Sequence, residues 1–430
     1  MKRRDFFRRS VPGILLPSLL NGFSLRAWAA SPISDAIGGD GDSENILVLV
    51  QLNGGNDGLN MVIPLEFYDC YQAARANIAI PENRILRLGG NDRTGLHPAM
   101  TGLQNLYNEG KLSIVQAVGY PKPSFSHFRA TDIWLSGADS TQSLPTGWAG
   151  RYLNEAFPDF PKDYPNPTMP DPLAIQVGSI VSPALQGPVF SMGMAISNTD
   201  NFYNLINGLP SAAADTRAGD QLAYIRDMSV KTDQYAGVIR QAAQKVKTQS
   251  DKYPAPGKNP LADQLKIVAR LIGGGLRTRL YMVSMGGFDT HAKQTEAADT
   301  SSGNHARLLA KFSEAVSAFM DDLKQQGSDE RVIGMSFSEF GRRIRSNASG
   351  GTDHGAAAPV LLFGKRVNPG ILGENPVIPV TATVNDNIPM QFDFRSLYST
   401  IMEKWFALGD RERESVLLKS YPLLPLFRNA

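Results

Sequence analysis

The sequence has almost no cysteine. Its 430 residues include one, Cys70, so no disulfide can form within the chain and the fold has no covalent cross-link. Cys70 lies in the run Phe67–Tyr71, which holds no second thiol and no basic residue to activate it. We therefore expect a packed structural cysteine rather than a nucleophile.

The sequence also lacks an excess of charge of either sign. It has 43 Lys and Arg against 41 Asp and Glu, and 42% of its residues are apolar, which excludes intrinsic disorder and a fibrous repeat. Without residues 1–29 the balance is 37 basic against 40 acidic residues, so no global field attracts nucleic acid or an anionic membrane. Function therefore has to come from a local site.

No apolar run is long enough to span a membrane, which takes about 20 residues. The N-terminal apolar stretch, residues 11–25, is broken by proline and glycine, follows Arg3 and Arg4, and precedes the small-residue sequence Ala27–Ala29. These features predict a twin-arginine signal peptide over residues 1–29, recognition by the twin-arginine export machinery, and a periplasmic or secreted protein. A basic amphipathic membrane anchor is the alternative, but it leaves the small-residue sequence unexplained.

Apolar runs of strand length recur after a Gly- and Asp-rich segment, residues 30–45, which we expect to be a flexible linker. The runs are Ile46–Val50, Leu112–Val118, Arg279–Met285 and Arg331–Phe337. Each leads to a polar motif, and helical patterns precede the later ones. This alternation predicts an α/β domain over residues 46–430, with a doubly wound, mostly parallel sheet flanked by helices. Ligands of such a sheet bind beyond the carboxyl ends of its strands.

A helical pattern interrupts this alternation. Residues 216–252 are rich in charge, carry apolar residues at helical spacing, and are flanked by loops. We expect a helical insertion over about residues 204–259 that packs on the sheet domain. A solvated interaction helix is the alternative.

Histidine is scarce, and three of the five histidines have neighbours typical of chemistry. The three motifs are Asp289-Thr290-His291, Asp353-His354 and Ser126-His127. Imidazole and carboxylate groups together are ligands of zinc, manganese and iron. Because these motifs follow the ends of different strands, we expect a divalent metal site at one edge of the sheet. The other two histidines, His97 before a helix and His305 on an apolar helix, we expect to be structural.

The candidate metal-binding residues also have structural interpretations. Asp57, in the Gly-rich loop after the first strand, can cap a helix or shape the turn. Asp353 and His354 stand between glycines and can be turn residues. Glu339 can bind a metal, assist a helix N-terminus or pair with Arg342.

Six short motifs carry a resemblance to a known family. They are Gly54–Asn60, Leu96–Pro98, Ser124–Phe128, Gly287–His291, Ser338–Arg342 and Gly351–Gly355. In order and spacing they resemble the exported domain-of-unknown-function family 1501, which is itself similar to the alkaline phosphatase and sulfatase superfamily. The resemblance extends from about Ile46 to Leu408 and implies an alkaline phosphatase-like fold.

What the superfamily implies is a two-metal hydrolase of phosphate or sulfate esters, with a small anionic ester as substrate. The metal ligands that the resemblance implies are Asp57, Asp289, His291, Asp353 and His354, and we expect Glu339 near them. Ser126 resembles the nucleophile, with His127 beside it at a helix start, where backbone N–H groups receive an oxyanion. Such a site uses divalent ions, zinc, manganese or similar, to deprotonate the hydroxyl and hold the reacting oxygens.

The chain departs from the phosphatase pattern in two ways. No histidine follows His354, and Asp289 and His291 are spaced D-x-H rather than D-x-x-x-H. The shortened ligand set favours a second hypothesis, a catalytically silent exported protein that binds a metal or ligand, whereas the Ser126–His127 motif favours the enzyme. A dinucleotide-binding oxidoreductase is a third hypothesis, but residues 53–58 lack the G-x-G-x-x-G spacing and contain an acid that would repel a pyrophosphate.

Overall fold

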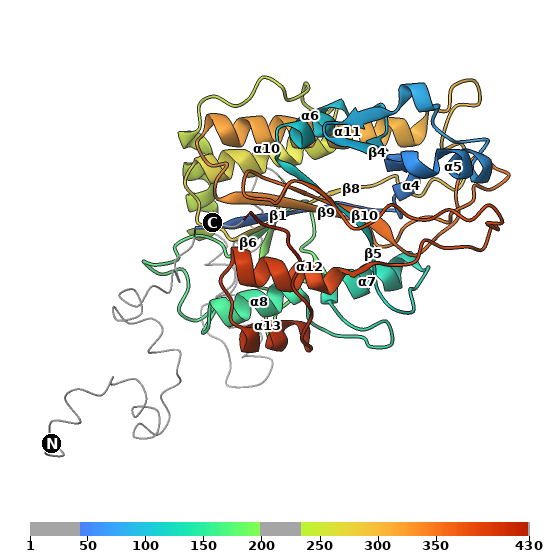
Figure 1. Cartoon of the computed structure of the whole chain (residues 1–430). Helices are drawn as coiled ribbons and strands as arrows, with labels where there is room; N and C mark the ends of the chain where they lie inside the picture. The colour runs from blue at the N-terminus through green and yellow to red at the C-terminus, as the bar shows by residue number, and fades with distance from the viewer. Residues whose placement is uncertain (1–43, 198–233, 429–430) are drawn as a thin grey trace, which may run out of the picture. The chain divides into compact units, whose positions relative to one another are not determined.

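A computed structural model describes residues 44–197 and 234–428 of the chain (Figure 1). The expected signal peptide, all but the last two residues of the expected linker, and the first part of the expected helical insertion lie outside these described residues. None of the helices within them combines the length and the apolar character that a membrane span requires.

A nine-stranded sheet is the centre of the described residues, in the order β11-β5-β10-β9-β1-β8-β6-β7, with β12 paired to β5. The strands are β1 (Ile46–Leu52), β5 (Leu112–Gly119), β6 (Ala174–Val177), β7 (Met194–Ile196), β8 (Leu280–Met285), β9 (Val332–Phe337), β10 (Ala358–Phe363), β11 (Gly370–Leu372) and β12 (Phe392–Asp393). Every pairing is parallel except those of β10, which runs antiparallel to both β5 and β9. The predicted mostly parallel α/β sheet is confirmed.

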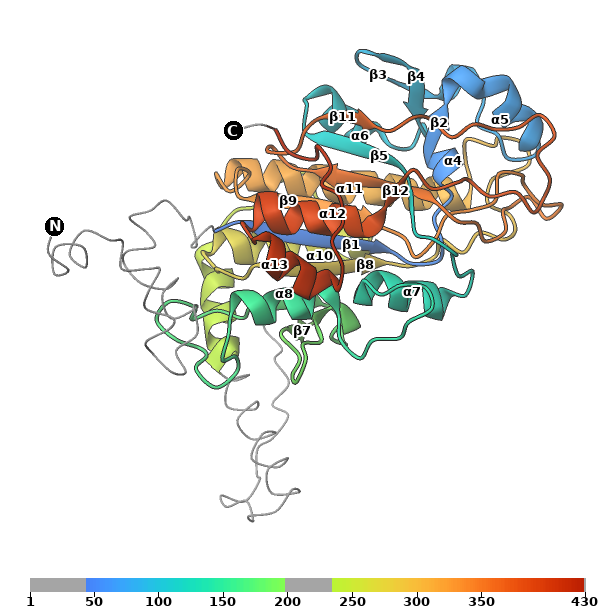
Figure 2. The same ribbon diagram turned by 60° about the horizontal axis from the view of Figure 1, so that its bottom comes forward.

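Helices cover both faces of this sheet, as Figure 1 shows. One face carries α6 (Thr101–Asn108), α10 (Pro260–Gly273) and α11 (Asn304–Gln325), and the other carries α7 (His127–Ser136), α8 (Trp148–Ala156), α12 (Phe394–Thr400) and α13 (Asp410–Leu417). Figure 2 brings the second face forward. Side chains of β1 alternate between the two apolar cores, with Val48 and Val50 on the α10 side and Leu47 and Leu49 on the other. Burial on both faces explains why β1 is a continuous apolar run.

The chain between β1 and β5 forms a small antiparallel sheet in the order β2-β4-β3. Its strands are β2 (Val62–Pro64), β3 (Leu86–Leu88) and β4 (Asn91–Leu96), with the short helices α4 (Gly58–Met61) and α5 (Tyr68–Ala74) beside them. Single turns of helix stand at η2 (Leu65–Phe67), η3 (Glu82–Arg84) and η4 (Pro183–Leu185), and η5 (Ile401–Trp405) continues α12 as a π-helix.

The described part of the expected insertion contains one helix, residues 234–245, that is buried against α10. Its Ile239 and Ala242 belong to the core on that face of the sheet. Gly274, just after α10, lies so near that a Cβ on it would be 2.2 Å from the Ala242 carbonyl oxygen. This helix packs on the sheet domain and does not stand alone in solvent.

Candidate metal centre

Five segments of the chain meet at the carboxyl edge of the parallel strands. Residues 53–57 follow β1, residues 286–291 follow β8 and residues 338–342 follow β9, while the connection after β5 leads to His127 at the start of α7. Because β10 is antiparallel, the residues that precede it, 351–357, also lie at this edge. Ligands of open α/β sheets bind at this edge.

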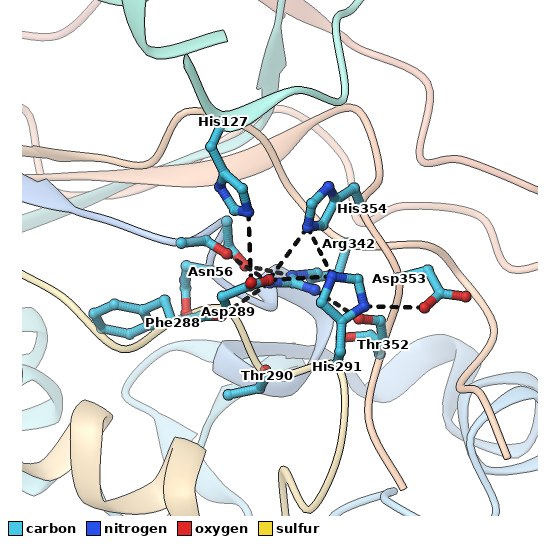
Figure 3. A network of polar contacts seen from close by, with 12 residues as sticks. Asn56, His127, Phe288, Asp289, Thr290, His291, Arg342, Thr352, Asp353 and His354 are labelled. Carbon is cyan, nitrogen blue, oxygen red and sulfur yellow. Dashed lines mark hydrogen bonds and ion pairs between the residues drawn. The ribbon is translucent and has the colours of Figure 1, made fainter. Parts of the chain in front are cut away.

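Asp289 is the centre of a cluster of three histidines (Figure 3). Its Oδ1 atom lies 3.2 Å from Nε2 of His291 and 3.2 Å from Nε2 of His354, and its Oδ2 atom lies 3.5 Å from Nε2 of His127. One ligand atom from each of His127, Asp289 and His354 falls within 4.8 Å of the others, a spacing that can hold a metal ion. We call His127, Asp289, His291 and His354 the histidine cluster.

Each ring of the histidine cluster is fixed by an oxygen acceptor at its other nitrogen, Nδ1. The pairs are His127 with Glu339 Oε1 (2.8 Å), His291 with Asp353 Oδ1 (3.1 Å) and His354 with the Phe125 carbonyl oxygen (2.8 Å). Carbonyl and carboxylate oxygens only accept hydrogen bonds, so each Nδ1 carries the hydrogen. In a neutral ring Nε2 then keeps its lone pair, which is the form in which imidazole binds a metal.

The Asp289 carboxylate is held in its ionised form. Partial burial opposes ionisation, but the hydrogen bond and charge of the Arg342 guanidinium, together with the neighbouring histidines, outweigh this effect and lower the pKa of Asp289 to about 2. Burial also lowers the pKa of His354 below its ordinary value, which favours the neutral ring. At neutral pH the pair therefore offers a carboxylate and a neutral imidazole, the protonation states that metal ligation requires.

Arg342 connects the loops that carry the cluster. Its guanidinium is buried and donates hydrogen bonds to the carbonyl oxygens of Gly54 (2.5 Å), Gly55 (2.6 Å) and Thr352 (2.6 Å), as well as to Asp289 Oδ1 (2.7 Å). The sequence left open a pair between Arg342 and Glu339. The structure pairs Arg342 with Asp289.

The Gly-rich loop after β1 lies directly against the cluster. Gly54 has a φ of +121°, and a Cβ on it would lie 2.4 Å from the backbone nitrogen of Asp289, so this position requires glycine. Its N–H donates to Glu339 Oε1 (2.8 Å), the same oxygen that accepts from His127. The loop therefore orients Glu339 toward His127 while leaving space for the Asp289 segment.

Two of the acids proposed as metal ligands contact the cluster from outside. Glu339 is 2% exposed, and its Oε1 is occupied by His127 and Gly54. Asp353 is exposed, and its Oδ1 accepts from His291 and from Asn347 Nδ2 (3.0 Å). Both acids therefore act on the imidazoles, and the structure does not place them among the converging Nε2 atoms.

Asp57 is not brought into the cluster. Its side chain is fully buried, and both carboxylate oxygens accept from Arg75 Nη1, at 2.8 and 2.6 Å, while Oδ2 also accepts from Gln294 Nε2 (2.6 Å). Burial alone raises the pKa of Asp57, but the charge of Arg75 and the hydrogen bonds from Arg75 and Gln294 together outweigh it and hold the pKa below its ordinary value. In this structure the Asp57 oxygens are engaged by Arg75 and Gln294, and Asp57 is not among the three residues whose ligand atoms lie within 4.8 Å of one another.

Ser126 lies at the N-terminus of α7, where the sequence places it. It is the residue before the first turn, and its exposed hydroxyl makes no hydrogen bond to the described residues. Its N–H donates to the hydroxyl of Ser124 (3.3 Å). The side chain that reaches the cluster from this motif is the imidazole of His127.

The remaining two histidines are core residues. Burial lowers the pKa of His97 to about 3 and that of His305 to about 4, and the two rings meet edge to face at 6.1 Å. His305 Nε2 lies 2.9 Å from Asn56 Oδ1, and His97 Nδ1 accepts from the Ala99 N–H (3.1 Å). Both are structural, as we expect from the sequence.

Sequence reasoning missed three buried or backbone groups that organise the site. Arg75, just after α5, and Gln294, in a loop, are ordinary polar residues, and their role depends on contacts across 18 and 237 positions of the chain. The third group is the backbone carbonyl of Phe125, so the identity of the Phe125 side chain gives no indication of its role. The nearness of Gln294 to His291 in sequence was the one available hint.

Comparisons with known proteins give one family and several distant structures. The family model DUF1501, described as a protein of unknown function, matches residues 45–417. No curated protein is significantly similar to the sequence.

Three solved structures illustrate the structural similarity. Ps i-CgsB in complex with k-i-k-neocarrahexaose is 11% identical, with 86% of this chain and 74% of that chain covered and a TM-score of 0.38. The sulfatase PsFucS1 from Pseudoalteromonas sp. is 12% identical, with 90% and 72% covered and a TM-score of 0.35. Alkaline phosphatase from the Antarctic bacterium TAB5 is 9% identical, with 77% and 94% covered and a TM-score of 0.30. Similarities this distant say nothing about the substrate of this chain.

Proposed function

The chain belongs to the DUF1501 family, and we propose that it is an exported metal-dependent hydrolase of phosphate or sulfate esters. The observation that supports this proposal is the convergence of three imidazole Nε2 atoms on Asp289, with each Nδ1 hydrogen-bonded to an oxygen acceptor. Core packing does not require such an arrangement. It is typical of a metal site in which oxygen acceptors at Nδ1 orient the imidazole ligands.

The residues present fit a divalent ion with nitrogen and oxygen ligands. His127, His291 and His354 would offer Nε2 and Asp289 a carboxylate oxygen, a donor set suited to zinc or manganese. When bound, such an ion polarises an ester oxygen and lowers the pKa of a coordinated hydroxyl or water. Arg342 keeps the Asp289 oxygen in place, and its charge adds to the positive field at the site.

We further propose Ser126 as the nucleophile and a small anionic ester as the substrate. The Ser126 hydroxyl is exposed at the beginning of α7, next to the residue whose ring enters the histidine cluster. The first N–H groups of that helix point toward the same end and favour a negatively charged group there. Attack of the hydroxyl on phosphorus or sulfur expels the alcohol, and water then cleaves the enzyme ester to release the acid and the free serine.

A second candidate is a catalytically silent protein that uses the histidine cluster only to bind a metal. The observation that favours it is the engagement of Asp57 with Arg75, which withholds one carboxylate from the site. The hydroxyl of Ser126 also makes no hydrogen bond to the part of the chain that the structure describes.

Metal content and ester turnover of the purified mature protein decide between these functions. The hydrolase predicts bound metal by elemental analysis and turnover of aryl phosphate or aryl sulfate. Ser126→Ala should then abolish turnover and keep the metal, Asp289→Ala should lose both, and Ser124→Ala serves as the matched control. A metal-loaded protein without turnover supports the silent protein, and a protein that binds no divalent metal contradicts both.

Export through the twin-arginine pathway is part of the proposal. Its support is the sequence of residues 1–29, which combines an arginine pair, a short apolar stretch and a small-residue cleavage sequence.

A further inference from the structure

A second set of buried polar residues lies directly behind the histidine cluster. It consists of Arg75, Asp57 and Gln294, all fully buried, and we call it the buried relay. None of the three belongs to the histidine cluster. Buried polar groups are retained in proteins when their hydrogen bonds are satisfied and when they fix a particular arrangement of the chain.

The contacts of Asp57 determine the orientation of the Gln294 side-chain amide. The Asp57 carboxylate only accepts hydrogen bonds, so the group of Gln294 that lies 2.6 Å from it is the NH₂ group. The amide oxygen consequently points the other way. It accepts from the hydroxyl of Thr290 (2.9 Å) and from the hydroxyl of Thr352 (3.1 Å).

The two threonines belong to the two loops that supply most of the histidine cluster. Thr290 stands between Asp289 and His291, and Thr352 stands two residues before His354. The backbone also joins them, since the Thr352 N–H donates to the Thr290 carbonyl oxygen (3.1 Å). The Gln294 side chain therefore links the loop after β8 to the loop before β10 through hydrogen bonds.

Arg75 fixes the far end of the relay. Its guanidinium donates to Asp57, to Asn60 Oδ1 (3.0 Å), and to the carbonyl oxygens of Ile344 (2.7 Å) and Arg343 (2.7 Å). Because these acceptors come from distant segments, Arg75 holds Asp57 in one place, and Asp57 holds the Gln294 amide.

We infer that Gln294 is a positioning residue of the metal centre, which sets metal affinity by holding the Asp289–His291 and Asp353–His354 loops in register. This inference rests on the proposed metal-dependent function. It assigns the relay a specific effect on ligand geometry, beyond a general contribution to stability. Loss of groups that orient metal ligands typically weakens binding about 10- to 100-fold.

Gln294→Met tests the inference, because methionine has a similar length and no hydrogen-bonding amide. The dissociation constant for zinc is measured by competition with a chelating dye on the full mature chain, with circular dichroism used to verify that each variant is folded. We expect Gln294→Met to weaken zinc binding about 10- to 100-fold.

Gln249→Met is a matched control from the opposite part of the fold. The Gln249 amide also donates to an aspartate, Asp322 Oδ2 (3.0 Å), and accepts from a guanidinium, that of Arg270 (3.0 Å). It belongs to the α10 and α11 layer and contacts no residue of the metal centre. We expect Gln249→Met to lower the melting temperature and to leave the zinc dissociation constant within about twofold of wild type.

Thr352→Val provides the test if Gln294→Met does not fold. Valine matches threonine in shape and removes only the hydroxyl that donates to Gln294, so Thr352→Val should by itself weaken zinc binding relative to wild type. Where Gln294→Met also folds, the loss for Thr352→Val should be the smaller of the two, and the double variant should lose no more than Gln294→Met. Wild-type zinc affinity in folded Gln294→Met or Thr352→Val would overturn the inference while the proposed function stands. Absence of zinc binding by the wild-type protein would overturn both.

Discussion

The Nε2 atoms of His291 and His354 lie 2.8 Å apart, while the Nδ1 atom of each ring faces an oxygen acceptor. With both rings neutral, two lone pairs face each other across this distance and repel. A proton on one ring removes the repulsion, and so does a cation bound by both. The pair is therefore an arrangement in which a proton and a metal ion compete for the same two nitrogen atoms.

Zinc binding should weaken as the pH falls. Imidazole takes up a proton near pH 6.5, and the proton must leave before Nε2 can bind a metal, so the zinc dissociation constant should rise by about tenfold or more between pH 8 and pH 5.5. Zinc titrations across this range measure the effect. A pH-independent dissociation constant would show that the histidines do not bind the ion.

Asp57→Asn should mainly lower the stability of the protein, whereas Asp289→Asn should mainly abolish zinc binding. Asp57→Asn leaves the buried Arg75 without a charged partner, and removal of one member of a buried ion pair costs about 3–5 kcal/mol. An oxygen acceptor for Gln294 remains, so zinc binding should stay within about tenfold of wild type. Asp289→Asn should instead lose zinc binding. Urea unfolding and zinc titration of both variants test this, and loss of zinc by Asp57→Asn alone would restore Asp57 as a ligand.

The stability contributed by Asp57 should depend on pH with a defined sign. Its folded pKa lies below the unfolded value of 3.8, so the contribution is complete above about pH 4 and is lost as the pH falls through the folded pKa. The difference in unfolding free energy between wild type and Asp57→Asn should therefore be largest near neutral pH and should shrink below about pH 4. A difference that grows on acidification would contradict the assignment of the ion pair.

Glu339→Ala and Asp353→Ala should weaken zinc binding without abolishing it. Each acid orients one imidazole, through His127 and His291 respectively, and loss of such partners costs about 10- to 100-fold in affinity. Glu339→Gln keeps an oxygen acceptor for His127 and should recover part of the loss. Complete loss of zinc in Glu339→Gln would instead identify Glu339 as a ligand.

Ser126→Ala should leave the stability of the protein nearly unchanged. Replacing a serine whose side chain caps a helix costs about 1 kcal/mol, but the Ser126 hydroxyl accepts no N–H of α7. Urea denaturation should give an unfolding free energy within about 0.5 kcal/mol of wild type. A loss of ester turnover in this variant then reports on chemistry and not on folding.

Replacement of both Arg3 and Arg4 by lysine should leave the precursor in the cytoplasm. The twin-arginine machinery reads the paired guanidinium groups, whose planar geometry lysine lacks. Cell fractionation followed by immunoblotting measures the distribution, and normal export of the double variant would remove the localisation proposal.

The sheet could be predicted from the sequence because its central strands are buried on both faces. Ile46–Leu52 and Val332–Phe337 are fully buried, and their apolar runs show it directly. The direction of β10 could not be predicted in this way, because an apolar run does not show whether its strand lies parallel or antiparallel to its neighbours. The short strands β11 and β12 depend on pairing with β5 rather than on a pattern of their own.

The candidate site could be predicted in composition and only partly in arrangement. Asp289, His291 and His354 stand where strand ends bring them together, as the alternation of strands and loops indicates. The position of Asp57 could not be predicted, because its partner Arg75 lies just after α5 in the small antiparallel region and the pairing requires the finished fold. A sequence shows which side chains can bind a metal. Whether a given carboxylate instead forms an ion pair with a guanidinium depends on tertiary packing.

The reversed direction of β10 also has a consequence for how the site is assembled. Residues 338–357 form one connection of 20 residues between hydrogen-bonded neighbours β9 and β10, and this single loop carries Glu339, Arg342 and His354. Closing a loop costs entropy that grows only with the logarithm of its length, and a 20-residue loop closes at less cost than the 229 positions that separate Phe125 from His354. Glu339, Arg342 and His354 thus lie on one local hairpin connection, and we expect their contacts to form earlier in folding than those of His127, which require distant parts of the chain to meet.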